Sequence, residues 1–168
     1  MNITAEYVRS RLDYDPETGV FTWKLQPGLA SWNARYSGKV AGSSDRYGYL
    51  MIKLQGRRLL AHRLVWLHVY GEWPAELVDH VNRDKADNRL SNLRAASYAQ
   101  NSANMTKRAR NTSGLKGVSP VSGTAKWRAR IKIERKSINL GTFSSKRDAH
   151  AAYVQAATRL YGEFATVA

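Results

Sequence analysis

The segment 125–133 constrains the fold of this chain more than any other, because its residues alternate strictly between apolar and cationic side chains. One side of the alternation consists of Trp127, Ala129, Ile131 and Ile133, and the other of Lys126, Arg128, Arg130 and Lys132. Period two predicts a β-strand with one face for a core and one wholly cationic face. The neighbouring segments 115–119 and 136–140 would complete a three-stranded antiparallel sheet.

A helix is expected directly after this sheet. Ser145 is a suitable N-cap, with Asp148 three residues later in the manner of a capping box, and Gly162 is a suitable terminator. Between them, Ala149, Ala152, Tyr153, Ala156, Ala157, Leu160 and Tyr161 form an apolar stripe at helical spacing. Such a helix would cover the apolar face of the sheet and leave the basic face open.

The net charge of the chain is +14, and its distribution is uneven. Residues 1–60 carry 9 basic and 5 acidic side chains, residues 61–106 carry 5 and 5, and residues 107–168 carry 13 and 3. A surplus of this size favours a polyanionic partner, nucleic acid before an anionic membrane or an acidic protein. The neutral middle holds three of the four histidines, which suggests chemistry in the middle and binding at the end.

Cysteine is absent from the chain, which excludes disulfides and cysteine-ligated zinc. We also find no apolar run of membrane-spanning length and no signal-peptide pattern at the N-terminus. The sequence therefore predicts a soluble cytoplasmic protein, in a bacterium or a phage-infected cell, with no membrane partner and no small-molecule substrate.

The N-terminal part reads as short strands and helices. We expect a helix over 4–12 capped by Thr4, followed by a turn at 15–19 and a strand at 20–23. A hairpin of 48–54 with 58–61 should come next, and then a helix from 61 to Gly71. His62 and His68 lie six residues apart on that last helix, which is unfavourable spacing for a metal pair.

The candidate reaction centre consists of Asp79, His80, Asn92 and Asn101. A short strand over 77–82 would carry Asp79 and His80, and a polar loop, a second strand and a helix from Ser97 would follow. Oxygen ligands from Asp79 and Asn101 suit one hard cation such as Mg²⁺ or Mn²⁺, and His80 could accept a proton from an attacking water. Spacing alone leaves open that the Asp-His pair is an ordinary surface dipeptide and that the asparagines form turns.

The wider pattern resembles the HNH endonucleases of phage and intron homing type over about 1–104. The resemblance rests on the segments 14–19, 61–66, 70–74, 78–82, 87–89 and 92–94 together with Asn101. It implies a ββα-metal fold in which Asp79 and Asn101 bind the metal, His80 is the general base, and Asn92 orients His80 or the scissile phosphate. His62 and Arg94 would contact phosphate, against the alternatives of packing behind the site and of simple surface charge.

Residues 114–166 resemble an AP2 DNA-binding domain, on the segments 117–118, 126–131, 140–143 and 151–153 and on Gly162. That family reads duplex DNA with a three-stranded sheet, and the matching positions are Lys116, Ser119, Arg128, Arg130, Lys132 and Asn139. The chain departs from the family at Ser137 and Asn139, where plant members typically carry Arg and Trp. The resemblance therefore implies the mode of reading but not the target sequence.

Between the two parts, residues 107–113 have the composition of a flexible basic linker. Lys107, Arg108 and Arg110 would follow phosphates, unless the segment is only a solvated connector. The expected organisation is thus α+β: a nuclease domain at 1–106, this linker, and at 114–168 a small AP2-type domain in which the sheet packs on one helix.

Together these features predict a metal-dependent enzyme that cuts double-stranded DNA. A monomer with one such site should nick one strand. Two alternatives remain: a sequence-specific DNA-binding regulator with an inactive HNH domain, and a general nucleic-acid-binding protein that prefers single strands.

Overall fold

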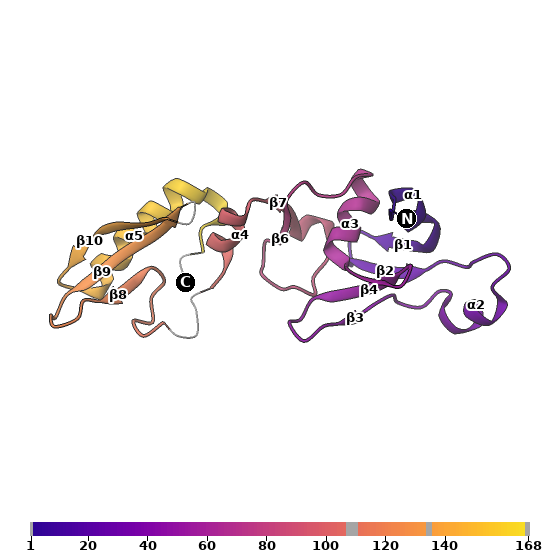
Figure 1. Cartoon of the computed structure of the whole chain (residues 1–168), viewed down its shortest axis with the longest axis horizontal. Helices are drawn as coiled ribbons and strands as arrows, with labels where there is room; N and C mark the ends of the chain where they lie inside the picture. The colour runs from indigo at the N-terminus through magenta and orange to yellow at the C-terminus, as the bar shows by residue number, and fades with distance from the viewer. Residues whose placement is uncertain (1, 107–110, 134–135, 167–168) are drawn as a thin grey trace. The chain divides into compact units, whose positions relative to one another are not determined.

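The computed structural model describes residues 2–106, 111–133 and 136–166. It divides into two compact units, Met1–Ala96 and Ser97–Ala168. Each unit contains helices and small antiparallel sheets (Figure 1), which confirms the mixed α+β class expected from the sequence.

The first unit begins with helix α1 (Ala5–Arg11), and the Thr4 side chain accepts a hydrogen bond from the Tyr7 amide as its N-cap. Strands β1 (Leu12–Asp15) and β2 (Val20–Trp23) pair antiparallel around the expected turn. Gly19 closes that turn with φ +73°, a conformation that favours glycine. A β-carbon at Gly19 would lie 2.4 Å from the backbone nitrogen of Arg89, so this turn lies directly against a loop near the candidate site.

Helix α2 (Ala30–Tyr36) and strand β3 (Ser43–Ser44) come next, before the hairpin of β4 (Leu50–Leu54) and β5 (Arg57–Leu60). Helix α3 (Ala61–Tyr70) follows at once and ends at Gly71, a left-handed C-cap as expected. The core of the unit lies among α1, α3 and these strands, and its fully buried larger side chains are Val8, Leu12, Phe21, Ile52, Leu64, Val65 and Leu67. Helix α2 contributes no buried residue to it.

The last hairpin of the first unit is β6 (Leu77–His80) with β7 (Leu93–Ala96). A polar loop and the 3-10 turn η1 (Leu90–Asn92) join the two strands. Val78 and Leu93 from this hairpin belong to the same core. The two strands of the hairpin therefore pack on the core of the first unit, although the loop between them is polar.

The second unit starts with helix α4 (Tyr98–Asn104), which Ser97 and Gln100 cap reciprocally in a capping box. Strands β8 (Val118–Pro120), β9 (Trp127–Ile133) and β10 (Lys136–Phe143) form an antiparallel sheet in the order β10-β9-β8. Helix α5 (Lys146–Tyr161) lies along one face of this sheet, and the short turn η2 (Gly162–Phe164) follows it (Figure 1).

The packing of α5 follows the alternation of β9. Ala129 and Ile131 are buried with Ala149, Tyr153 and Ala157 of the helix. Gly117 allows the helix to come close: a β-carbon there would lie 2.0 Å from the ring of Tyr153. Arg130 and Lys132 are exposed on the other face, so the strand separates an apolar face from a cationic one as its period predicts.

Candidate functional site

The hairpin β6–β7 places Asp79 opposite Arg94 and His80 opposite Leu93. Asp79 is 5% exposed, and its Oδ2 accepts a hydrogen bond from Nε of Arg94 at 3.1 Å and lies 3.1 Å from Nη2 in the same ion pair. A buried carboxylate is stable only with such compensation. Arg94, predicted as a phosphate contact, therefore holds the Asp79 carboxylate in this structure.

His80 is also 5% exposed, and its Nε2 lies 3.4 Å from Oδ1 of Asn88. The Asn88 side-chain nitrogen donates to the carbonyl of Ala86, so Oδ1 is left as the acceptor and Nε2 of His80 is the donor. The other ring nitrogen, Nδ1, then carries the lone pair. Burial lowers the pKa of His80, an effect that the Asn88 hydrogen bond and nearby carboxylates partly offset. The imidazole is therefore neutral near pH 7, as a general base must be.

Asn88 is itself fixed by the β1–β2 turn. Its side chain is buried, and its backbone carbonyl accepts from the hydroxyl of Tyr14 at 2.8 Å. Gly19 lies against the backbone of Asn88 and Arg89, and the Leu90 amide donates to the carbonyl of Pro16. The turn at 15–19 thus supports the residue that contacts His80.

The side chain of Asn92 makes hydrogen bonds to the backbone of the β6–β7 loop. Its Oδ1 accepts from the Asn82 amide at 2.9 Å, and its Nδ2 donates to the carbonyl of Asp87 at 2.8 Å. The resemblance implied that Asn92 orients His80 or the scissile phosphate, and it gave Asn88 no role. The signal for Asn88 was its place in the segment 87–89, but nothing in the sequence distinguishes this buried asparagine from a turn former.

His62 lies near His80 within the first unit. It is 5% exposed on α3, and its ring centroid is 4.9 Å from that of His80 in an edge-to-face arrangement. Burial, followed by the neighbouring His80 and Arg63, lowers the pKa of His62 to about 3. Its Nδ1 is buried without a hydrogen-bond partner among the described residues. The buried ring of His62 thus lies against the ring of His80.

Asn101 lies on α4, in the second unit. That helix is held to the rest of its unit at its C-terminal end. Thr166 donates from its amide to the carbonyl of Ala103 and from its hydroxyl to the carbonyl of Asn104. Lys116 donates from Nζ to the carbonyls of Ala103 and Met105 at 2.5 and 2.6 Å. Lys116, predicted as a DNA contact, thus has its ammonium group directed to α4.

The other predicted contacts of the second unit lie on the sheet. In the strand register, Arg128 is opposite Ser119 and Arg130 is opposite Asn139, so these pairs share the face away from α5. Lys132 is on the same face. No acidic residue occurs in the described strands 118–120, 127–133 and 136–143. Lys107, Arg108 and Arg110 of the predicted linker are outside the described residues.

The donor set limits which metal this chain could hold. Within the described residues, no group of three His, Asp or Glu side chains is arranged to bind an ion. A site built from one carboxylate and one amide oxygen fits a hard cation, which takes the rest of its ligands from water and phosphate. Asp79 of the first unit and Asn101 of the second each carry an oxygen donor of this type, the type that suits Mg²⁺ or Mn²⁺. The described residues do not fit a zinc site of several histidines.

Comparison with known proteins identifies a family match in the segment that holds most of these residues. Residues 59–103 match the HNH endonuclease family, a range that contains His62, Asp79, His80, Asn88, Asn92 and Asn101. Protein 3.8 of Escherichia phage T7 is 37% identical over 79 residues, which are 46% of this chain and 65% of that protein. The chain thus covers less than two thirds of this relative's length. No solved structure matches the chain.

None of the described helices is both long and apolar enough to cross a membrane.

Proposed function

We propose that this chain is a metal-dependent DNA endonuclease of the HNH type, and that it nicks duplex DNA. The segment 59–103, which is similar to HNH endonucleases, is the part that carries the chemistry. The similarity to a phage protein is consistent with a homing or related phage role.

The observation that carries this proposal is the state of His80. It is a buried imidazole with a lowered pKa, its Nε2 is taken by Asn88, and a carboxylate precedes it on the same strand. A fixed neutral imidazole beside a potential metal ligand is the arrangement that activation of water requires. A histidine that only filled the core would need neither the oriented ring nor the adjacent buried acid.

The residues have distinct roles in the proposed hydrolysis. Asp79 would hold one divalent cation, and the resemblance to HNH endonucleases implies Asn101 as a second ligand. When bound, the cation would supply charge stabilisation at the scissile phosphate. His80 accepts the proton of the attacking water at Nδ1, while Asn88 keeps the ring in position. Arg94 holds Asp79 in place, and His62 packs behind His80 and limits its movement.

The second unit selects the DNA site in this proposal. Its open sheet face carries cations on the central strand, flanked by hydroxyl and amide side chains. Arg130 with Asn139, and Arg128 with Ser119, are suited to base edges and phosphates in a major groove. This is the AP2-like mode implied by the resemblance of residues 114–166, and the enzyme would act as a monomer.

One observation favours the alternative of a DNA-binding regulator with an inactive nuclease domain. Arg94 already neutralises Asp79, because its Nε donates to Oδ2 and its Nη2 lies 3.1 Å from the same oxygen, and a neutralised carboxylate attracts a cation less strongly. A carboxylate has about four lone-pair positions, however, so that it can accept from a guanidinium and still bind an ion. Catalysis by the purified protein separates the two functions.

The experiment is incubation of the full chain with supercoiled plasmids that carry a random-sequence library, in the presence of Mg²⁺ or Mn²⁺. We expect open-circular DNA, which EDTA abolishes and which His80→Ala lowers at least about 100-fold. His68→Ala is the matched control, because His68 lies on α3 and contacts Tyr14 and Phe21 rather than His80. An intact library with both ions, or equal cleavage by His80→Ala, would overturn the proposal.

A further inference from the structure

A second surface of the first unit lies outside the segment that matches the HNH family. Between strands β2 and β3 the chain leaves the core and forms α2, none of whose residues is buried. Trp23, Trp32 and Tyr36 pack on one another there, with ring centroids 5.3 to 6.5 Å apart. We call these three rings the aromatic cluster; Trp23 also packs against the main core, whereas Trp32 and Tyr36 are not part of that core.

Hydrogen bonds fix the segment between β2 and β3 although it is largely exposed. Gln26 is 7% exposed and donates to the carbonyls of Ser10 and Lys24. Gln26 and Asn33 also exchange two hydrogen bonds of 2.8 and 2.7 Å between backbone and side chain. The amides of Trp23 and Ala41 donate to the carbonyls of Lys39 and Phe21, which closes this segment along β2. The structure thus presents a fixed set of rings on its surface.

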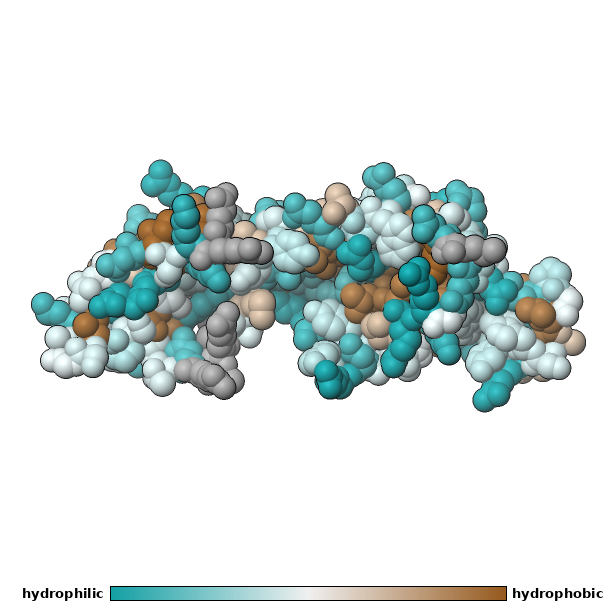
Figure 2. All heavy atoms as spheres, in the orientation of Figure 1, coloured by the Kyte–Doolittle hydropathy of each residue, from teal (hydrophilic) through white to brown (hydrophobic). Residues whose placement is uncertain are grey.

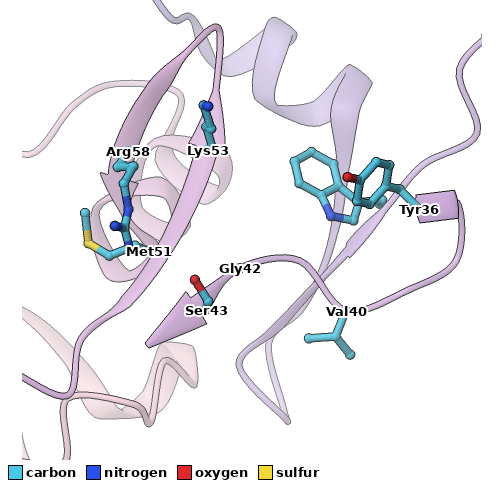
Figure 3. Close-up of a pocket in the computed structure, with 8 residues that line it drawn as sticks. Tyr36, Val40, Gly42, Ser43, Met51, Lys53 and Arg58 are labelled. Carbon is cyan, nitrogen blue, oxygen red and sulfur yellow. The ribbon is translucent and has the colours of Figure 1, made fainter. Parts of the chain in front are cut away.

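Two adjacent hollows of about 320 Å³ each open at the aromatic cluster. Both are lined by Trp23, Tyr36 and Lys53. In the first, Tyr36 lies on one side and Met51, Lys53 and Arg58 of the β4–β5 hairpin lie on the other (Figure 3). Each volume is at the lower limit for a small-ligand site, about the space for one planar ring with its substituents.

The charged side chains in this part of the sequence are almost all positive. Residues 18–71 contain eight Lys or Arg and a single acidic residue, Asp45. Arg11 lies 5.0 Å over the ring of Trp32 and Arg35 lies 5.4 Å over that of Tyr36. Exposed apolar side chains adjoin the cluster, with Leu25 at 67% and Val40 at 65% exposure. In Figure 2, hydrophobic side chains (brown) lie beside hydrophilic ones (teal) over the part of the first unit that contains α2, at the right of the view.

We infer that the aromatic cluster, with Lys53 and Arg58, binds a short run of unpaired nucleotides. Rings such as Trp23 and Tyr36 stack on the faces of bases, and these faces are accessible only when a base leaves the duplex. Lys53 and Arg58 would bind the phosphates between them. The two hollows share three lining residues, so bases bound in them would be neighbours on one strand. This inference goes beyond the proposed hydrolysis, since it adds a single-strand site away from His80.

The test is binding of the full chain to a short fluorescein-labelled oligothymidine, measured by fluorescence anisotropy with EDTA present. We expect Tyr36→Ala to weaken binding at least about fivefold. Lys53→Gln should also weaken it and lower its salt dependence. Both side chains are exposed, so neither change removes core packing. The matched controls are Tyr70→Ala, an exposed ring on α3, and Arg57→Gln, an exposed cation of the same hairpin that lines neither hollow.

Two results would overturn the inference. One is a loss of binding in Tyr36→Ala and Lys53→Gln no larger than in the controls. The other is an equal loss for a duplex of the same length, which would mean that the surface contacts only the DNA backbone. Because the assay measures binding without metal, it gives its answer whether or not the chain cleaves DNA.

Fluorine NMR reports on the site while all three side chains of the aromatic cluster are kept. In the full chain labelled with 5-fluorotryptophan, the Trp23 and Trp32 resonances, assigned with Trp→Phe variants, should shift on addition of oligothymidine. Trp66 and Trp73 lie outside both hollows and serve as references. Saturated binding with unchanged Trp23 and Trp32 resonances would contradict the inference.

Discussion

The side-chain oxygen of Asn88 lies 3.4 Å from Nε2 of His80, within a buried part of the β6–β7 hairpin. This contact makes Nε2 of His80 the hydrogen-bond donor, so that Nδ1 carries the lone pair. Because Asn88 is 1% exposed and its nitrogen is bound to the Ala86 carbonyl, its oxygen has little freedom to move. The orientation of the proposed base therefore depends on a residue outside the Asp79-His80 dipeptide.

Asn88→Ala should consequently lower the cleavage rate about 10- to 100-fold, since even a small misplacement of a reacting group is costly. The same change should lower the free energy of unfolding by about 1 to 3 kcal/mol, because it leaves buried polar atoms without partners. Leu90→Ala is the control: it loosens the same loop from the core without touching His80. If both variants lose activity only in proportion to stability, Asn88 has no positioning role.

The turn before β2 should act on the site through Asn88. In Gly19→Ala the added methyl group would lie 2.4 Å from the Arg89 nitrogen, so the loop at 88–89 must shift. Gly28→Ala introduces the same backbone strain, at φ +77°, but meets no atom within 4 Å. We expect Gly19→Ala to lose both stability and cleavage, and Gly28→Ala to lose only a little stability. Thermal unfolding and plasmid nicking measure the two effects.

His62 should make the stability of the first unit depend on pH. Its folded-state pKa of about 3 lies below the value of 6.5 in the unfolded chain, so protonation favours unfolding. Stability is complete above pH 6.5 and falls as the pH decreases toward 3. Between pH 6.5 and 5, protonation of this one group should lower the free energy of unfolding by about 1.5 kcal/mol.

Denaturant unfolding of the first unit at several pH values checks this dependence. His62→Gln should reduce the loss between pH 6.5 and 5, where Asp and Glu titrate little; burial also lowers the pKa of His68 and of His80, so these two histidines keep the remainder of it. His150→Gln, a histidine of α5 in the other unit, should leave the unfolding of the first unit unchanged. An equally steep loss in His62→Gln would contradict the burial of a neutral His62.

The open sheet face of the second unit should determine the choice of DNA sequence. If the guanidinium of Arg130 binds a base edge, Arg130→Ala should relax the preference for one base. The binding free energy for the specific site should then weaken by about 1 to 3 kcal/mol. Lys116→Met should leave the salt dependence of binding unchanged, because the ammonium group is directed to the α4 carbonyls. Selection from a random duplex library tests both. A loss of salt dependence in Lys116→Met would place Lys116 on the DNA after all.

The elements with a clear hydrophobic period could be predicted from the sequence. Helices α1, α3 and α5 and strand β9 bury one face against a core, and burial is what produces such a period. Helix α2 was not expected, because none of its residues is buried and its rings pack on one another. Its sequence therefore lacks the apolar stripe by which helices are recognised.

The site could be predicted as a set of residue types but not as a set of contacts. Asp79 and His80 adjoin in sequence, so their proximity follows from the chain itself. The partners of their polar atoms, Arg94 and Asn88, depend on the strand register and on the path of the loop. Local sequence carries little information on either, since an asparagine before an arginine looks the same in a solvated turn and in a buried one.

The most direct test of the account is the single-turnover rate of plasmid nicking with Mg²⁺, for wild type and for His80→Ala prepared in parallel. We predict a Mg²⁺-dependent conversion of supercoiled to open-circular DNA by wild type and a rate at least about 100-fold lower for His80→Ala. Nicking at equal rates by the two proteins, or no nicking by wild type at any metal concentration, would contradict the assignment of this hairpin as a nuclease site.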